Sequence, residues 1–303
     1  MIHTSIRLSV IRRISATMEE GEAKAVAMLL FEKLFGLSQT DVLMGKAEGL
    51  EASDVQCLDK CVDRICSGEP VQYVLGKADF MGMELDVTPA VLIPRPETEE
   101  LVNEVVNALA DRKSPRILDI GTGSGCIALA IKQLIPLAEV TAWDISTEAL
   151  RVARNNAKQL GLGICFEQRD ILSTNLSVMQ EVFDLIVSNP PYICRQESEE
   201  MERRVTDFEP NTALFVPDDD PLLFYRAITR FASVALRAGG QLFFEINRRF
   251  GRQVCELMHQ AGFEGVTLKT DQFDNPRIVY GNHKEKNCCS GSPVEVGKPL
   301  RQG

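Results

Sequence analysis

The sequence lacks several features that would each assign it to a class of protein. No apolar run approaches the roughly 20 residues that a membrane-spanning helix requires, so we expect no membrane association. Its nine cysteines include no Cys-x-x-Cys pair and no zinc-ligand spacing with the three histidines, so no metal site is predicted. An odd number of cysteines, scattered along the chain, indicates a reducing compartment, and we expect a cytoplasmic protein.

Positive charge is also scarce. The net charge is -10, whereas duplex binding usually requires a basic face, so a nucleic-acid substrate is disfavoured, although a local basic patch is not excluded. At 303 residues, of which 45% are hydrophobic, the chain can bury a substantial core, and two domains are expected. We expect the protein to act as a monomer.

Residues 1–70 show helical patterns and no convincing strand. Apolar residues recur at helical spacing before Gly36, a natural stop, and Ser53 fits the N-cap of a helix that ends before Gly68. A small helical bundle that docks a partner is expected. The basic start, residues 1–15, is also typical of an organelle targeting segment, but a first amphipathic helix is the interpretation that we favour.

Residues 71–96 are expected to connect this bundle to a second domain. Three short apolar runs lie between glycine and proline residues and predict strands or a hairpin, over 71–75, 80–83 and 85–87. The segment from Ile93 to Glu99 is then a stiff entry to a helix, because two prolines restrict it and acidic residues occupy the first turn.

The second domain is expected over residues 97–282. From Arg116 onward strand and helix patterns alternate, which indicates an α/β fold with a doubly wound, mostly parallel sheet. A closing pair near 266–269 and 277–280 is expected to add an antiparallel edge, and residues 283–303 a disordered tail. The predicted strands are 117–120, 140–143, 164–168, 183–187 and 241–246, and the helices are 126–134, 147–160, 222–236 and 253–260.

Acidic and glycine-rich sites follow three successive strands, and in this architecture they face one crevice. The loop Asp119-x-Gly121-x-Gly123-x-Gly125 lets the backbone approach a ligand closely. Asp144 is placed to accept hydrogen bonds from ribose hydroxyls, and Asp170 could accept one from an adenine amine. The spacing departs from the dinucleotide fingerprint at Cys126, so a dehydrogenase is disfavoured.

The fourth strand ends in Asn189-Pro190-Pro191-Tyr192. Neither proline can donate a ladder hydrogen bond, and Pro190 pushes Asn189 out of the helical region, which gives a rigid corner. The Asn189 side-chain oxygen and the Pro190 carbonyl can bind the hydrogens of a planar NH2 group, and Tyr192 could stack on a flat substrate. An ordinary strand-ending turn is the alternative. With the nucleoside site, the corner fits S-adenosylmethionine, whose methyl group would point at this nitrogen.

These residues carry a family resemblance. Asp119 to Gly125, Asp144, Asp170 and Asn189 to Tyr192 resemble the class I methyltransferases that modify exocyclic or amide nitrogens. Three further stretches resemble the HemK/PrmC family, the peptide chain release factor glutamine N5-methyltransferases, and the resemblance covers residues 5–282. These stretches are Gly68 to Gly76, Leu92 to Glu99 and Asp207 to Pro210.

The resemblance implies methylation of the glutamine in the Gly-Gly-Gln tripeptide of bacterial-type release factors, which the helical domain would recognise. Two positions depart from the family: it often has an aromatic residue in place of Ile171 and a glycine where Asn247 begins Asn247-Arg248-Arg249. By motif match, cofactor contacts are implied for Gly121, Thr122, Gly123, Ser124, Gly125, Asp144, Asp170, Ile171 and Asn189, and substrate contacts for Asn189, Pro190, Pro191 and Tyr192.

Two other functions stay open at this point. A nucleic-acid adenine or guanine N-methyltransferase would use the same chemistry, and a non-catalytic adaptor could keep the cofactor pocket. We assign no general base, because His3, His259 and His283 are all remote from the motifs in sequence. We therefore expect positioning and electrostatics to provide the rate acceleration, with Asn189 as the residue on which transfer depends.

Overall fold

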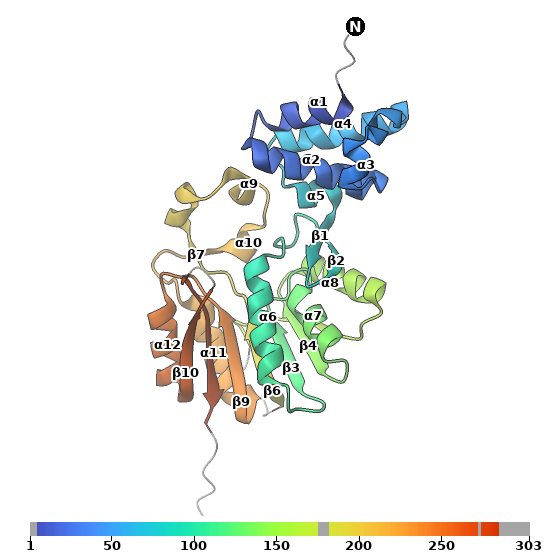
Figure 1. The fold of residues 1–303 in the computed structure, drawn as a ribbon. Helices are drawn as coiled ribbons and strands as arrows, with labels where there is room; N and C mark the ends of the chain where they lie inside the picture. The colour runs from blue at the N-terminus through green and yellow to red at the C-terminus, as the bar shows by residue number, and fades with distance from the viewer. Residues whose placement is uncertain (1–4, 175–181, 272–273, 285–303) are drawn as a thin grey trace, which may run out of the picture.

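Helices make up the chain as far as Leu75 in the computed structural model, which describes residues 5–174, 182–271 and 274–284. Figure 1 shows this helical region at one end of the molecule. Within the described residues, no helix combines the length and apolar character needed to cross a bilayer. The elements are α1 (Ile6–Ile14), α2 (Glu20–Phe35), α3 (Gln39–Leu43), the 3-10 turn η1 (Lys46–Gly49), α4 (Ala52–Cys66) and α5 (Val71–Leu75).

Local signals in the sequence account for some of the helix ends in this region. Gly36 ends α2 in the left-handed conformation, with φ of 66°, as its position predicts. α3 begins with a capping box, in which Ser38 and Asp41 bond each other's backbone N–H groups. The predicted cap at Ser53 is wrong, because α4 begins at Ala52 with Glu51 in the N-cap position.

The basic start of the chain packs as an amphipathic helix. Val10 and Ile14 of α1 are buried in the core of the helical region, and α1 contacts α2 and α4. On its polar side, Arg13 bonds Asp63 of α4 at 2.6 Å. The amphipathic-helix interpretation is therefore confirmed for Ile6–Ile14.

The connector between the two regions differs in part from the prediction. The predicted strand 71–75 is wrong, since α5 occupies it, with Gly76 at its end in the left-handed conformation. A five-residue apolar run does not distinguish helix from strand by periodicity, and here the flanking proline and glycine decide. The predicted hairpin is confirmed, with its turn inside the predicted strand 80–83. Its strands are β1 (Lys77–Phe80) and β2 (Met83–Asp86).

The expected α/β fold is confirmed. Within the described residues the main sheet has seven strands in the order β10-β11-β9-β6-β3-β4-β5. β11 is antiparallel to both β9 and β10, so the closing pair forms as expected, and the other pairings are parallel. The strands are β3 (Arg116–Ile120), β4 (Glu139–Asp144), β5 (Cys165–Gln168), β6 (Phe183–Ser188), β9 (Leu236–Glu245), β10 (Phe263–Thr270) and β11 (Pro276–His283).

Helices cover both faces of this sheet, and each face has its own apolar core (Figure 1). Successive strand residues point to opposite faces, so Leu185 of β6 enters one core and Ile186 enters the other. A strand buried on both sides reads as a continuous apolar run, which is how β6 looks in the sequence. One face carries α6 (Pro96–Ala108), α7 (Cys126–Leu134) and α8 (Thr147–Leu160), and the other carries α11 (Leu223–Ala235) and α12 (Gly251–Gln260).

The segment between β6 and α11 extends from the sheet toward the helical region (Figure 1). Arg204 of this segment donates a 2.5 Å hydrogen bond to Glu22 of α2, which joins the two regions. The predicted tail lies almost wholly outside the described residues, and β11 runs to His283. The elements of the segment are β7 (Ile193–Cys194), η3 (Arg195–Glu200), α9 (Arg203–Thr206), α10 (Asn211–Leu214) and β8 (Phe215–Val216).

Candidate active site

The strand order of the sheet reverses between β3 and β6. From β3 the chain continues to β4 and β5 on one side, whereas β6 pairs with the opposite edge of β3. The last residues of the two strands are neighbours, and Ser188 Oγ donates a 2.6 Å hydrogen bond to the Ile120 carbonyl. Open α/β sheets bind ligands beyond the carboxyl ends of the strands at such a reversal. The loops that follow β3 and β6 therefore define the candidate site.

The loop after β3 exposes its backbone to this site. Gly121 and Gly123 have φ of 77° and 56°, a conformation that other residues rarely adopt. A Cβ atom on Gly123 would meet nothing within 4 Å, and one on Gly121 would meet only the Asn189 carbonyl oxygen, 4.0 Å away. A ligand can therefore approach the backbone of this loop closely.

Gly125 has a different position from the other two glycines. A Cβ atom here would lie 3.1 Å from Leu129 Cδ1 of α7 and 3.2 Å from the Cβ of Ala153 in α8. Gly125 is also in the left-handed conformation, with φ of 86°, and it is not among the residues that line the cavity. The structure thus places Gly125 where the loop turns into α7 and the two helices approach each other.

Two acidic side chains lie at the base of the glycine loop. Asp144, at the end of β4, lines the cavity; its Oδ2 accepts from Gly123 N and its Oδ1 from Ser146 N, each at 2.9 Å. Each oxygen keeps a lone pair for another donor. Asp119 is buried beneath the loop, outside the cavity lining, and accepts a 2.7 Å hydrogen bond from Thr122 Oγ1. Burial raises the pKa of both carboxyls, that of Asp119 to about 7.

The turn after β5 forms another wall of the cavity. Asp170 Oδ1 accepts a 2.9 Å hydrogen bond from Leu172 N, and Asp170 and Ile171 both line the cavity. Phe224 and Ile228 of α11 also line it. These apolar side chains make this part of the cavity suited to a flat ring, with a carboxylate at its rim.

The corner after β6 presents polar groups to the same cavity. Asn189, Pro190 and Pro191 line it, and Asn189 Nδ2 donates a 3.3 Å hydrogen bond to Thr98 Oγ1. Within the described residues, nothing donates a hydrogen bond to the Asn189 side-chain oxygen or to the Pro190 carbonyl. Tyr192 is not part of the lining; its hydroxyl instead donates to Glu245 Oε1 at 3.2 Å. The structure therefore directs the Tyr192 hydroxyl toward β9.

Asn247, one of the positions that depart from the family pattern, supports this corner from behind. Its Nδ2 donates a 3.1 Å hydrogen bond to the Tyr192 carbonyl, and its backbone N–H donates to Tyr225 Oη at 3.3 Å. The side chain thus contributes contacts that a glycine could not make, and the loop after β9 remains packed against the corner.

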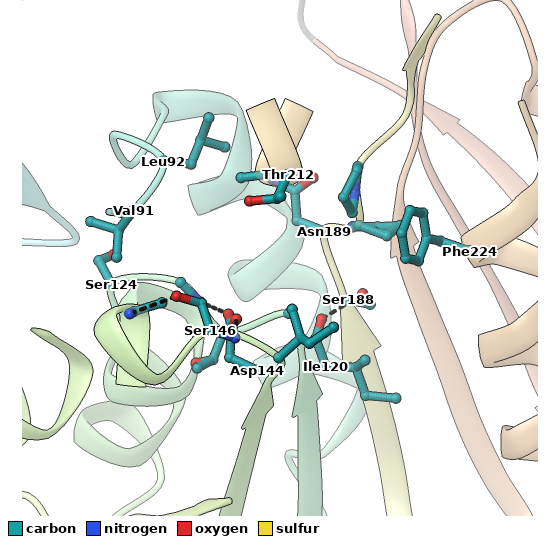
Figure 2. Close-up of a pocket in the computed structure, with 18 of the residues that line it drawn as sticks. Val91, Leu92, Ile120, Ser124, Asp144, Ser146, Ser188, Asn189, Thr212 and Phe224 are labelled. Carbon is teal, nitrogen blue, oxygen red and sulfur yellow. Dashed lines mark hydrogen bonds between the residues drawn. The ribbon is translucent and has the colours of Figure 1, made fainter. Parts of the chain in front are cut away.

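The cavity encloses about 410 Å³, within the usual range for small-molecule sites. Figure 2 shows Asp144 and Ile120 side by side at the ends of their strands, with Asn189 above them. The sequence-predicted residues that line it together are Gly121, Thr122, Gly123, Ser124, Asp144, Asp170, Ile171, Asn189, Pro190 and Pro191, whereas Gly125 and Tyr192 lie outside the lining.

Sequence reasoning assigned no role to Thr98, Phe224 or Glu245. Thr98 and Phe224 line the cavity, and Glu245 binds the hydroxyls of both Thr98 and Tyr192. A signal for Glu245 was present, since it is an acidic residue at the carboxyl end of a buried strand, as Asp144 is. Phe224 gave no such signal, because an aromatic residue on an amphipathic helix is usually a core residue.

Comparison with known proteins agrees with this geometry. Residues 99–207 match the family model of the methyltransferase small domain, and residues 9–76 match that of the PrmC N-terminal domain. The chain is 43% identical over 261 residues to the release factor glutamine methyltransferase of Bacteroides thetaiotaomicron, over 86% of this chain and 93% of that one. It is 36% identical over 289 residues to the release factor glutamine methyltransferase of Flavobacterium psychrophilum, over 94% and 100% of the two chains.

Among solved structures, a methyltransferase from Pyrococcus furiosus is similar, with a TM-score of 0.50 at 16% identity over 73% of this chain and 97% of that one. At this identity the likeness concerns the fold alone. The two sequence relatives carry more weight, because the similarity extends over almost their whole length. The chain belongs to the family of release factor glutamine methyltransferases.

Proposed function

We propose that this protein transfers a methyl group from S-adenosylmethionine to the side-chain amide nitrogen of the glutamine in the Gly-Gly-Gln tripeptide of a peptide chain release factor. One observation carries the proposal beyond family membership. The Asn189 side chain and Pro190 line the cavity beside the Gly121 loop, and their oxygens have no hydrogen-bond donor among the described residues. Two acceptors at the end of one strand suit a group with two N–H hydrogens.

The residues present fit this cofactor. Asp144 places a carboxyl group at the glycine loop, where its oxygens accept from Gly123 and Ser146, and an acidic side chain there disfavours a pyrophosphate and favours a positively charged group. The remaining lone pairs of Asp144 suit ribose hydroxyls. The apolar walls at Ile171 and Phe224 suit a purine ring, with Asp170 near enough to accept from its amine. Gly121 and Gly123 leave the space that a ligand against the backbone requires.

When bound, S-adenosylmethionine supplies a methyl group activated by its attachment to a positively charged sulfur. The chain's own contribution is to orient the acceptor nitrogen. An amide nitrogen is a poor nucleophile because its lone pair is delocalised, so Asn189 and Pro190 accept its hydrogens and stabilise positive charge that develops on it. Among the described residues that line the cavity there is no histidine, and we assign no general base. The proton leaves to solvent after transfer.

The helical region is proposed to recognise the release factor away from its glutamine. The match of residues 9–76 to the PrmC N-terminal domain supports this role. The contact of this region with the segment that follows the Asn-Pro-Pro-Tyr corner, through Arg204 and Glu22, supports it as well. We propose residues 1–70 as this domain, 71–96 as the connector and 97–282 as the methyltransferase domain. A monomer acting in the cytoplasm, where bacterial-type release factors act, is proposed as the working state.

Mass spectrometry tests the function directly. After incubation of purified release factor with the enzyme and S-adenosylmethionine, the peptide that contains the target glutamine should gain one methyl group. Asn189→Ala should abolish this gain and leave the dissociation constant for S-adenosylmethionine largely unchanged. Methyl incorporation into DNA or ribosomal RNA, with an unmodified release factor, would instead establish the nucleic-acid function. Cofactor binding without turnover on any of the three substrates would establish the adaptor.

A further inference from the structure

Three elements converge on one buried carboxylate behind the candidate site. Glu245, the last residue of β9, is 2% exposed, and Thr98 of α6 is 3% exposed. Thr98 Oγ1 donates a 2.7 Å hydrogen bond to Glu245 Oε2, and the Tyr192 hydroxyl donates to the other carboxylate oxygen. Asn189 Nδ2 donates a 3.3 Å hydrogen bond back to Thr98 Oγ1. Thr98 therefore links the buried carboxylate to the carboxamide at the corner.

The number of available hydrogens fixes the direction of these linked hydrogen bonds. An ionised carboxylate can only accept hydrogen bonds, and a threonine hydroxyl has one hydrogen to donate. Once Thr98 donates that hydrogen to Glu245, it offers only a lone pair to Asn189. The Asn189 NH2 group can bind that lone pair, whereas its carbonyl oxygen cannot.

Burial raises the pKa of Glu245, and the donations from Thr98 and Tyr192 and the positive charge of Arg277 offset this only in part. The geometry supports an accepting carboxylate, because one hydroxyl donates to each of its two oxygens. Within the described residues no side-chain or backbone donor bonds the Asn189 side-chain oxygen, and Thr98 is the partner of its NH2 group. The hydrogen bond to Thr98 is therefore the contact that distinguishes the two ends of the Asn189 carboxamide.

We propose that Glu245 and Thr98 are positioning residues that hold the Asn189 carboxamide with its oxygen, and not its NH2 group, toward the substrate. This inference rests on the proposed function, in which that oxygen accepts a hydrogen bond from the target amide. The two ends of a carboxamide have nearly the same shape, so packing alone does not select one of them. We call the linked hydrogen bonds from Asn189 through Thr98 to Glu245 the relay. Without the relay, a flipped Asn189 would present N–H hydrogens to the N–H hydrogens of the substrate.

The relay also determines which side chains the site accepts. With oxygen outward, Asn189 and Pro190 offer two acceptors, which bind a glutamine amide and repel a glutamate carboxylate. With its NH2 group outward, Asn189 would instead donate to a carboxylate. Glu245 and Thr98 therefore act as determinants of amide specificity, although neither has to touch the substrate.

The test compares Thr98→Val, Thr98→Ser and Glu245→Gln with the parental enzyme, using methyl transfer to purified release factor. Thr98→Val keeps the shape of the side chain and removes the hydroxyl, whereas Thr98→Ser keeps the hydroxyl. Glu245→Gln can donate its own NH2 hydrogens to Thr98 Oγ1, which frees the threonine hydrogen for the Asn189 oxygen. The matched control is Thr229→Val in α11, a fully buried threonine outside the cavity lining whose hydroxyl has no hydrogen-bond partner among the described residues.

We expect Thr98→Val and Glu245→Gln to lower kcat about tenfold to a hundredfold, with smaller changes in KM and in the dissociation constant for S-adenosylmethionine. Thr98→Ser should restore kcat to near the parental value, and Thr229→Val should not lower it. A purely structural role would instead lower the melting temperature and the folded fraction without changing kcat per folded molecule. Parental kcat in folded Thr98→Val would overturn the relay.

A second readout does not depend on the substrate. The NMR signals of the Asn189 side-chain NH2 group, assigned by their loss in Asn189→Ala, should exchange with solvent faster in Thr98→Val than in the parental protein or Thr98→Ser. Equal exchange rates would overturn the relay. If the parental enzyme left release factor unmethylated while these exchange rates differed as expected, the proposed function would be wrong and the relay would stand.

Discussion

Arg95 and Glu209 form an ion pair across 114 residues of sequence, in which the Glu209 side chain is 1% exposed and that of Arg95 is 36% exposed. Glu209 also accepts a 3.2 Å hydrogen bond from the backbone of Ile93. Arg95 lines the cavity, so this pair fastens the segment after the Asn-Pro-Pro-Tyr corner to the entry of α6. The two partners differ in exposure, because the Arg95 side chain can reach water if the pair is broken and the Glu209 side chain cannot.

This asymmetry predicts unequal effects of removing each partner. Arg95→Ala leaves a buried carboxylate without its counter-ion and should cost about 2 kcal/mol or more of unfolding free energy. Glu209→Gln still accepts from Ile93, and the remaining arginine can turn to solvent, so its cost should be about 1 kcal/mol. Urea denaturation of the two variants measures the difference. A larger loss for Glu209→Gln than for Arg95→Ala would contradict this account.

The proposed ribose contact predicts an effect on cofactor affinity. Asp144→Ala removes a charged acceptor from the cavity and should raise the dissociation constant for S-adenosylmethionine about a hundredfold, because hydrogen bonds to charged groups contribute about 1.5–3 kcal/mol each. Asp144→Asn keeps an oxygen and should raise it less. Isothermal titration calorimetry measures both. Unchanged affinity in Asp144→Ala would place the ribose elsewhere.

The buried Asp119 predicts a pH-dependent contribution to stability. Its pKa is about 7 in the folded protein, against an ordinary value of 3.8, so between about pH 4 and 7 the folded chain holds a proton that the unfolded chain has released. The contribution of neutral Asp119 is therefore complete below pH 4 and is lost as the pH rises through 7.

Asp119→Asn cannot lose a proton and still accepts from Thr122 through its oxygen. Its unfolding free energy minus that of the parental protein should increase from pH 4 to pH 7 by on the order of a few kcal/mol. Urea titrations at a series of pH values measure this difference. Parallel stability curves for the two proteins would show that Asp119 is ionised in the folded state throughout this range.

The relay through Thr98 predicts a change in inhibitor preference. A release-factor domain with glutamate in place of the target glutamine should inhibit the parental enzyme weakly, because two acceptor oxygens face its carboxylate. In Thr98→Val the freed Asn189 can donate to that carboxylate, so the inhibition constant should fall about tenfold. Competition assays against the unmodified domain measure it, and Thr98→Ser serves as the matched control.

The strands and helices of the sheet domain could be predicted from sequence because their signals are local. Parallel strands buried on both faces read as apolar runs, and Gly161 marks the end of α8 where the sequence predicts it. The segment 71–75 could not be assigned in this way, since its length suits both a strand and one helical turn. Only the neighbouring Pro70 and Gly76 distinguish the two, and their effect is a capping effect.

The site was predictable to the extent that topology places it. Asp144 is the last residue of one parallel strand and Asn189 follows another, so a sheet of this class brings them to the same edge. The orientation of Tyr192 depends on side-chain packing, which residue spacing does not encode. The contact between Thr98 and Glu245 joins positions 147 residues apart, and no local pattern specifies it.

Gly125 restricts which substitutions the protein can accept at this position during evolution. Because its missing side chain permits the close approach of α7 to α8, the packing of these helices and the conformation of the ligand loop both depend on this one residue. A bulkier residue there would strain the loop backbone, because Gly125 has a positive φ, and would also press on Leu129 and Ala153. Variation at this position is thus restricted by the architecture even where no ligand touches it, and invariance at Gly125 among relatives would by itself reveal nothing about catalysis.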